Sequence, residues 1–250
     1  MAYNIIEVLK DKLETPLVGN TGFLAPNLEE NTEAIQHIED AIKGAGYEGK
    51  VKIAINVNAS AFFKDGKYDL KFKSEESDPE EYKSSEDMIT MYKDIKTNFP
   101  SVIMLEDPLH KEDYEGWTTL TTDLPNVMMV GDHLIGSNLT RFQKAIAEKA
   151  ASCVSLGLEH IGTISETLQF VEHAKKFKWS ICIGSGDVGT DDTFISHFAI
   201  GIGADVFKVG APSSNPNIVR YNQLVRLEAE LGSKAQYAGP ELEKKLTPEK

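Results

Sequence analysis

The sequence is poor in cysteine. Its two cysteines, Cys153 and Cys182, both lie in apolar segments, and neither has the CxxC or histidine spacing of a zinc or redox site. Two such residues are typical of buried thiols in a reducing compartment, and their small number excludes a disulfide-stabilised scaffold. At 250 residues the chain is long enough to bury a hydrophobic core without disulfide or metal support.

Long apolar segments are also lacking. No stretch of about 18 apolar residues is present, which excludes a membrane-spanning helix. Met1 is followed by polar and charged residues instead of the basic and apolar regions of a signal peptide. The sequence therefore predicts a cytoplasmic protein.

Positive charge is scarce relative to negative charge. The chain carries 26 Lys and Arg against 39 Asp and Glu, which gives a net charge of −13 with neutral histidines. Proteins that bind nucleic acids or anionic membranes present a basic surface, so this balance argues against both kinds of partner.

Six short apolar segments stand out along the chain, each with a polar residue or a glycine at or just after its end. From Glu106 onward these end positions recur at intervals of about 25 residues, and such segments are typical of parallel strands buried on both faces. The segments are residues 51–55, 102–105, 127–130, 153–156, 179–183 and 206–207, and the end positions are Asn56, Glu106, Asp132, Gly157, Gly184 and Lys208.

Helical patterns lie between these segments. The spacing of apolar residues predicts helices over residues 3–13, 29–43, 85–98, 140–149, 164–177 and 218–231. Ser165 is expected to cap the helix that starts at 164, and Gly232 to end the last helix. Alternating residues on both sides of Asp65-Gly66 predict a small hairpin.

Alternating strands and helices predict an α/β fold with a parallel sheet, arranged as a TIM (β/α) barrel. We expect a single domain: opening helices and a loop at residues 1–50, about six βα units at 51–240 and a solvated tail at 241–250. Because a full barrel has eight strands, the barrel is expected to be incomplete at its N-terminal end. Its first and last strands would then be open edges that favour pairing with a protein partner or self-association.

Three of the strand-end residues could carry chemistry together. Glu106 and Asp132 follow adjacent strands, so their carboxylates would converge near the barrel axis, where oxygen ligands suit Mg²⁺; each could also be an ordinary loop carboxylate or helix cap. Lys208 ends a buried strand and would point at the same place as a contact for an anion or substrate. The histidines beyond the strand ends are expected to be loop or supporting residues: His110, His133 and His160.

Several specific stretches resemble the enolase family, whose members dehydrate 2-phosphoglycerate to phosphoenolpyruvate in glycolysis. They are residues 62–70 (FFKDGKYDL), 105–108 (LEDP), 161–163 (IGT), 192–195 (DTFI), 208–212 (KVGAP) and 221–224 (YNQL). The resemblance covers nearly the whole chain and implies an enolase-type barrel with Mg²⁺ chemistry. Enolases also carry an N-terminal α+β domain and two opening barrel strands, and this chain is expected to lack both.

The metal ligands implied by the resemblance are partly retained. The family's Asp, Glu and Asp correspond to Asn56, Glu106 and Asp132, and the amide oxygen of Asn56 is a weaker ligand than a carboxylate. A weakened Mg²⁺ site is therefore expected. Lys208 corresponds to a retained basic residue that contacts substrate.

The residues that would move protons and bind phosphate are changed. The lysine base of the family corresponds to Gly157, and its glutamate acid corresponds to Thr21. The Ser-His-Arg-Ser segment that binds phosphate corresponds to residues 184–187 around Ser185, where the histidine and the arginine are missing. A general acid or base contributes about 10²–10⁴-fold to a rate, so these losses predict that essentially all activity is gone.

The leading hypothesis is therefore a catalytically inactive, enolase-like scaffold that binds a protein partner. One alternative is an Mg²⁺-dependent phosphopyruvate hydratase completed by another chain, and only that alternative implies a small phosphorylated acid as ligand. A third hypothesis is a module that binds a metal or small anion through Glu106, Asp132 and Lys208.

Overall fold

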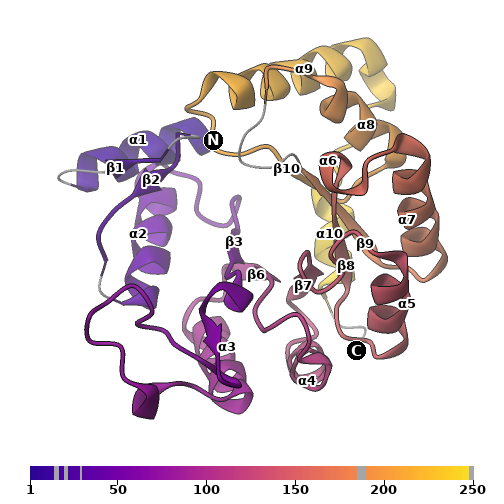
Figure 1. Cartoon of the computed structure of the whole chain (residues 1–250). Helices are drawn as coiled ribbons and strands as arrows, with labels where there is room; N and C mark the ends of the chain where they lie inside the picture. The colour runs from indigo at the N-terminus through magenta and orange to yellow at the C-terminus, as the bar shows by residue number, and fades with distance from the viewer. Residues whose placement is uncertain (14–16, 20–21, 29, 185–189, 248–250) are drawn as a thin grey trace.

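A six-stranded parallel sheet forms the centre of the protein (Figure 1). The computed structural model describes residues 1–13, 17–19, 22–28, 30–184 and 190–247. The sheet consists of β3 (Ile53–Asn56), β6 (Val102–Glu106), β7 (Met128–Gly131), β8 (Cys153–Gly157), β9 (Ser180–Gly184) and β10 (Val206–Lys208). Their spatial order, β10-β9-β8-β7-β6-β3, follows the chain and every pairing is parallel, which confirms the predicted α/β architecture.

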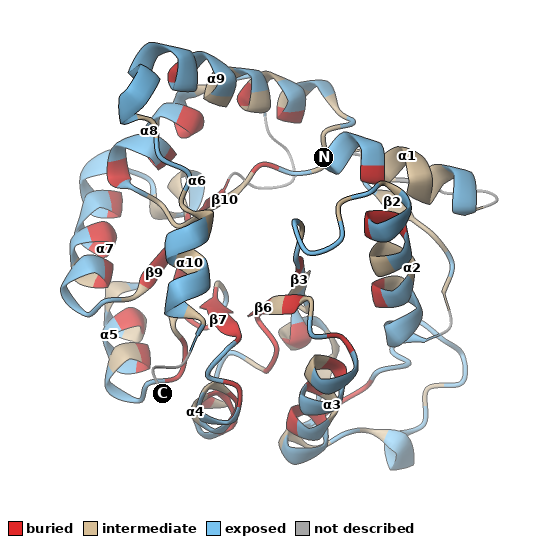
Figure 2. Cartoon of the chain, turned by 180° about the vertical axis from the view of Figure 1, so that it is seen from behind, coloured by how far each residue is buried: buried red, intermediate tan, exposed pale blue. Residues whose placement is uncertain are grey.

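The sheet is curled, and helices surround its outer face (Figures 1 and 2). The helices on the outside are α1 (Ala2–Lys12), α2 (Asn31–Gly44), α3 (Ser85–Asn98), α4 (Tyr114–Asp123), α5 (Leu139–Ala147), α7 (Ile164–Lys176), α8 (Phe194–Ile202) and α9 (Asn215–Leu231). This is an incomplete TIM barrel. The strands β3 and β10 are its two edges, as predicted, because no other strand of the described residues pairs with their outer sides. None of the described helices is long and apolar enough to cross a membrane.

The four central strands, β6 to β9, bury side chains on both faces because successive side chains point in opposite directions. On the outer face, the strand residues join the large core under the helices: Leu105, Met129, Val154, Leu156, Ile181 and Ile183. On the inner face, a separate cluster is formed by Met104, Met128, Val130, Cys153 and Cys182. The continuous apolar segments of the sequence thus reflect two hydrophobic layers, and both cysteines are free and buried as expected.

The helix ends show where the sequence patterns were accurate. The six predicted helices are all present, with ends within three residues of the predicted ones. Thr163, and not Ser165, caps α7, because its hydroxyl accepts the backbone N–H of Glu166 at 3.1 Å. The prediction for Ser165 was wrong by two residues because both positions offer a hydroxyl, and only the first has the extended backbone of a cap.

The helices that escaped the sequence prediction include α4 and α8. The α8 sequence, FISHFAIGI, is apolar almost throughout, and a short apolar segment cannot be assigned to helix or strand by its periodicity. In α4 the start is fixed by Asp113, whose carboxylate accepts the backbone N–H of Gly116 at 3.0 Å. Trp117 and Leu120 then bury the inner side of this helix against the core.

The C-terminal segment is not the solvated tail that the sequence suggested. Residues Gly239–Lys245 form a helix, α10, which lies on the inner side of the curled sheet (Figures 1 and 2). Leu242 and Leu246 pack against the inner cluster of Met104, Met128, Val130, Cys153 and Cys182. The segment is rich in charged residues, so its two leucines alone did not predict a short amphipathic helix.

The predicted hairpin is present after β3. Its strands are β4 (Phe63–Lys64) and β5 (Lys67–Tyr68), and they pair in antiparallel register. Asp65 and Gly66 both have positive φ, 52° and 82°, which is the geometry of a two-residue turn between twisted strands. A second antiparallel pair near the N-terminus joins β1 (Leu17–Val18) to β2 (Leu24–Ala25).

Candidate functional site

Glu106, Asp132 and Lys208 meet at the carboxyl end of the sheet, as predicted. Glu106 is the last residue of β6, Lys208 is the last residue of β10, and Asp132 directly follows β7. The Nζ atom of Lys208 lies 2.5 Å from Oε1 of Glu106 and 3.9 Å from Oδ2 of Asp132. Since β10 and β6 are separated by three strands, this contact forms across the inside of the curled sheet.

Burial governs the charges of this cluster. The side chain of Glu106 is almost fully buried, and burial raises the pKa of its carboxyl, an effect that Lys208 offsets only in part. Burial alone would lower the pKa of Lys208, but the attraction of Glu106 outweighs it, and the pKa of this ammonium is raised. In this pair, the buried carboxylate of Glu106 holds Lys208 in its charged form.

Asn56 completes the set of oxygen donors around the cluster. It ends β3 directly beside Glu106 in the sheet register, so both side chains leave the same face of the sheet. One amide and two carboxylates are oxygen ligands of the chemistry that Mg²⁺ accepts. These donors fit a hard cation, but the Lys208 ammonium already contacts Glu106, so a metal ion bound there would have to displace it.

Asp107 positions this site, although in the sequence it stood out only as part of a motif. It is buried, and its carboxylate accepts the backbone N–H groups of Asp132 at 3.1 Å and of His133 at 2.9 Å. Its own backbone adopts a positive φ of 45° and links β7 to the residues after β3, through Val130 and Ala59. The signal for this role was an aspartate after a strand, a residue type that tolerates left-handed backbone.

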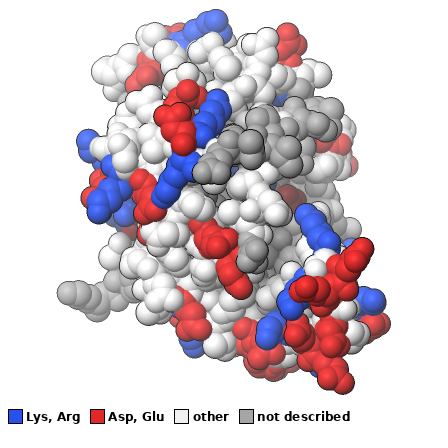
Figure 3. Space-filling view, turned by 90° about the vertical axis from the view of Figure 1, so that its left-hand side faces the viewer, with Lys and Arg blue, Asp and Glu red and all other residues white. Residues whose placement is uncertain are grey.

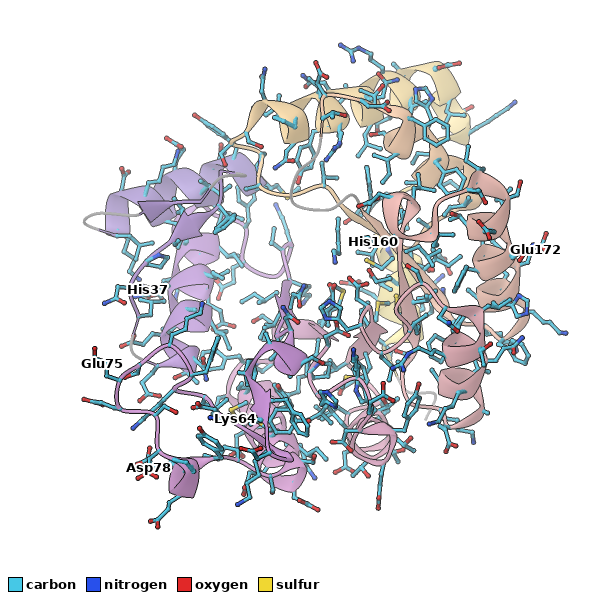
Figure 4. All side chains as sticks on the ribbon, viewed as in Figure 1. His37, Lys64, Glu75, Asp78, His160 and Glu172 are labelled. Carbon is cyan, nitrogen blue, oxygen red and sulfur yellow. The ribbon has the colours of Figure 1, made fainter. Side chains whose placement is uncertain are left out.

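The three histidines lie around the site without entering it. His133 is half exposed, and its ring Nδ1 lies 3.1 Å from Oδ2 of Asp107, a hydrogen bond that raises the pKa of the imidazole. His110 stacks on Phe63 with ring centroids 4.1 Å apart, and burial lowers its pKa. His160 belongs to the short helix α6 (Leu158–Ile161) that follows β8 (Figure 4). His110 and His133 thus lie in loops and His160 in a short helix, and their supporting role stays a prediction.

The comparison with known families decides the assignment. A family model described as "Enolase, C-terminal TIM barrel domain" matches residues 2–246 of the chain. The chain belongs to the enolase family.

The carboxyl end of β8 carries a glycine and therefore no side chain. Gly157, which the resemblance aligns with the lysine base of enolase, ends β8 beside Gly184 of β9. Its φ of −116° is open to any residue, and the nearest atoms that a Cβ atom would meet belong to the side chains of His160 and Glu159. The backbone therefore does not require glycine at this position.

Gly184 differs from Gly157 in this respect. A Cβ atom there would come within 2.9 Å of Cβ and 3.1 Å of the carbonyl oxygen of Lys208. The absence of a side chain lets β9 approach β10 closely and leaves room for the lysine. The two other positions aligned with enolase chemistry, Thr21 and Ser185, lie outside the described residues.

Proposed function

We propose that this chain is an enolase-like scaffold without hydratase activity of its own, which assembles with a protein partner in the cytoplasm. The observation that carries the proposal is Gly157, which offers no side chain at the strand end where the resemblance assigns the general base. In the charged cluster at the same end of the sheet, Lys208 pairs with Glu106, and its charged ammonium cannot accept a proton. The sequence changes at Thr21 and Ser185 support the same conclusion.

The test is a hydratase assay of the purified full chain with 2-phosphoglycerate and excess Mg²⁺. We expect no turnover above the uncatalysed rate, since loss of the acid and the base each removes about 10²–10⁴-fold. Formation of phosphoenolpyruvate at ordinary enzymatic rates would overturn the proposal. A variant that carries Glu106→Gln serves as the control for contaminating enolase, because a contaminant would give the same rate in both preparations.

The open edge of β3 is the surface we assign to the partner. The backbone N–H groups of Ile53 and Val57 donate to Ser101 and Glu106, so the alternate residues, Ala54 and Asn56, turn their backbone groups to the open side. An apolar groove of about 470 Å³ lies beside this edge, between α2, β3 and α3. Its walls include Ile35, Ile38, Met91 and Phe72. An extended segment with alternating apolar residues would add a strand here and fill the groove.

The charged residues near the groove indicate which extended segments would bind there. Phe72 is followed by five exposed acidic residues within positions 75–81, and acidic side chains gather in this part of the surface in Figure 3. Glu75 and Asp78 point away from the sheet on this loop (Figure 4). The partner segment is therefore expected to carry Lys or Arg at the end that lies near this loop.

Ala54→Pro tests the edge directly. Proline removes the N–H group that faces the open side of β3 and leaves the hydrogen bonds to β6 in place. A partner that is recovered from native cells with the unchanged chain is expected to be lost with this variant. Equal recovery with both proteins would show that the partner binds elsewhere.

An Mg²⁺-dependent hydratase completed by another chain is the second candidate, and the retained cluster of Glu106, Asp132 and Lys208 favours it. In that case the cluster would hold Mg²⁺ and contact the phosphorylated acid. Activity that appears only after addition of a co-purifying chain would support this candidate. A module that binds metal alone is distinguished by calorimetry, where no heat at millimolar Mg²⁺ would remove it.

A further inference from the structure

The helix α10 is attached to the sheet by few contacts. It has seven residues, and most of its side chains are exposed. Leu242 and Leu246 are the half-buried residues that pack on the inner face of the sheet. Lys245 adds polar contacts: its Nζ atom lies 2.6 Å from Oδ1 of Asp205 and 3.3 Å from the hydroxyl of Ser180.

Its position is opposite to that of the charged cluster. Ser180 is the first residue of β9, and Asp205 directly precedes β10, so Lys245 holds α10 at the N-terminal ends of the strands. Glu106 and Lys208 lie at the other ends of the strands. Changes in α10 can therefore be studied without altering the residues of the candidate site.

Beneath α10 lies the inner apolar cluster, which contains two thiols. Cys153 and Cys182 lie on neighbouring strands, and both side chains are fully buried beside Met104, Met128 and Val130. Burial raises the pKa of Cys153 well above its usual value and that of Cys182 to about 12. Both sulfur atoms are therefore protonated and shielded while α10 is in place, which suppresses their nucleophilicity.

The helix α10 is not expected to be stable without its contacts to the sheet. A helix of seven residues is too short to be stable alone in water, so α10 exists because it is docked. The segment that joins it to α9 is exposed, and Tyr237 within it is 87% exposed. Elements with few buried contacts open at lower free energy than the core of a protein.

We propose that α10 is a removable cover, and that Cys153 and Cys182 form a modification site for small α,β-unsaturated carbonyl compounds when it leaves. In the reaction, a thiol loses its proton, a bond forms between the sulfur and the β-carbon of the electrophile, and a proton is added at the α-carbon. No group leaves and no oxidant is needed. The inference stands independently of the proposed scaffold function, because it needs neither the open edge of β3 nor the side chain missing at Gly157.

The experiment uses the full chain and N-ethylmaleimide, an electrophile of this class, with mass spectrometry to follow modification of each cysteine at neutral pH. Leu242→Asp places a charge on the docked side of α10, and Lys244→Asp places the same residue on its exposed side, where Lys244 pairs only with Glu241 in the described contacts. We expect labelling of Cys153 and Cys182 to be more than about tenfold faster in the Leu242→Asp chain than in the unchanged chain. The Lys244→Asp chain should react at nearly the unchanged rate.

Urea separates release of the cover from unfolding of the whole chain. Release of α10 exposes little surface, so labelling in the unchanged chain should accelerate in urea well below the main unfolding transition and with a shallow slope. Equal labelling of the two aspartate variants would overturn the proposal. So would labelling that follows the global unfolding transition in every chain.

Discussion

The carboxylate of Asp107 holds the backbone of Asp132 in place, with Oδ1 accepting the N–H group of Asp132 at 3.1 Å. The other oxygen accepts the N–H group of His133 at 2.9 Å. Asp107→Ala removes both acceptors from a buried position and places alanine at a positive φ. We expect the free energy of unfolding to fall by about 2–4 kcal/mol. Urea unfolding followed by circular dichroism measures this change.

Asp94 provides the control for that substitution. It is exposed on α3, and Asp94→Ala is expected to change the free energy of unfolding by no more than about 0.5 kcal/mol. Similar losses in the two variants would contradict the positioning role of Asp107.

The same carboxylate predicts a pH effect at His133. The pKa of His133 is raised by its hydrogen bond to Asp107, so the charged imidazole is stabilised in the folded chain. The stabilisation is fully present below the ordinary histidine pKa of about 6.5, and it is lost as the pH rises through the raised folded-state pKa. NMR titration of His133 should show this raised value in the unchanged chain and a lower one after Asp107→Asn. An unaltered titration in the variant would contradict the assignment.

The two strand-end glycines should respond differently to a methyl group. Gly184→Ala brings Cβ within 2.9 Å of Cβ of Lys208, and overpacking of this kind costs about 1–3 kcal/mol of stability. Gly157→Ala requires only that the His160 side chain moves, so we expect a change below about 1 kcal/mol. Thermal unfolding of both variants compares them, and a larger loss for Gly157→Ala would show that this position is constrained by packing.

Lys208 is expected to compete with Mg²⁺ for Glu106 and Asp132. Lys208→Met removes the ammonium and keeps an unbranched side chain, which leaves two carboxylates without a cationic partner in the described contacts. We expect the Kd for Mg²⁺, measured by calorimetry, to fall roughly tenfold, equivalent to about 1.4 kcal/mol. Adding Glu106→Gln to this variant should abolish the gain. An unchanged Kd in the single variant would show that the cluster is not a metal site.

The central sheet was predictable because buried parallel strands leave a plain pattern. Each of the six apolar segments became a strand, and three of the residues at their ends, Glu106, Asp132 and Lys208, became the charged cluster. The sequence could not show which apolar residues face the helices and which face inward, because the central strands are buried on both faces. The inner cluster and its contact with α10 were therefore invisible.

The role of Asp107 was hidden for a different reason. Its hydrogen bonds go to backbone N–H groups, and a side chain that binds backbone leaves no matching residue type elsewhere in the sequence. The departures at Asn56 and Gly157 were readable because the family resemblance fixed what those positions would otherwise contain.

The order of the strands has a consequence for how the chain assembles. Because β3 to β10 lie side by side in the same order as in the sequence, each new βα unit can add to a sheet that is already formed. Each parallel pairing nevertheless joins residues that are distant in the chain, such as Ile53 and Val102, so the sheet is expected to form slowly. Amide exchange should be slowest in β7 and β8, which lie at the centre of the sheet, and fastest in the edge strands β3 and β10. Local opening of the sheet is therefore expected to begin at its two edge strands and to reach the central strands last.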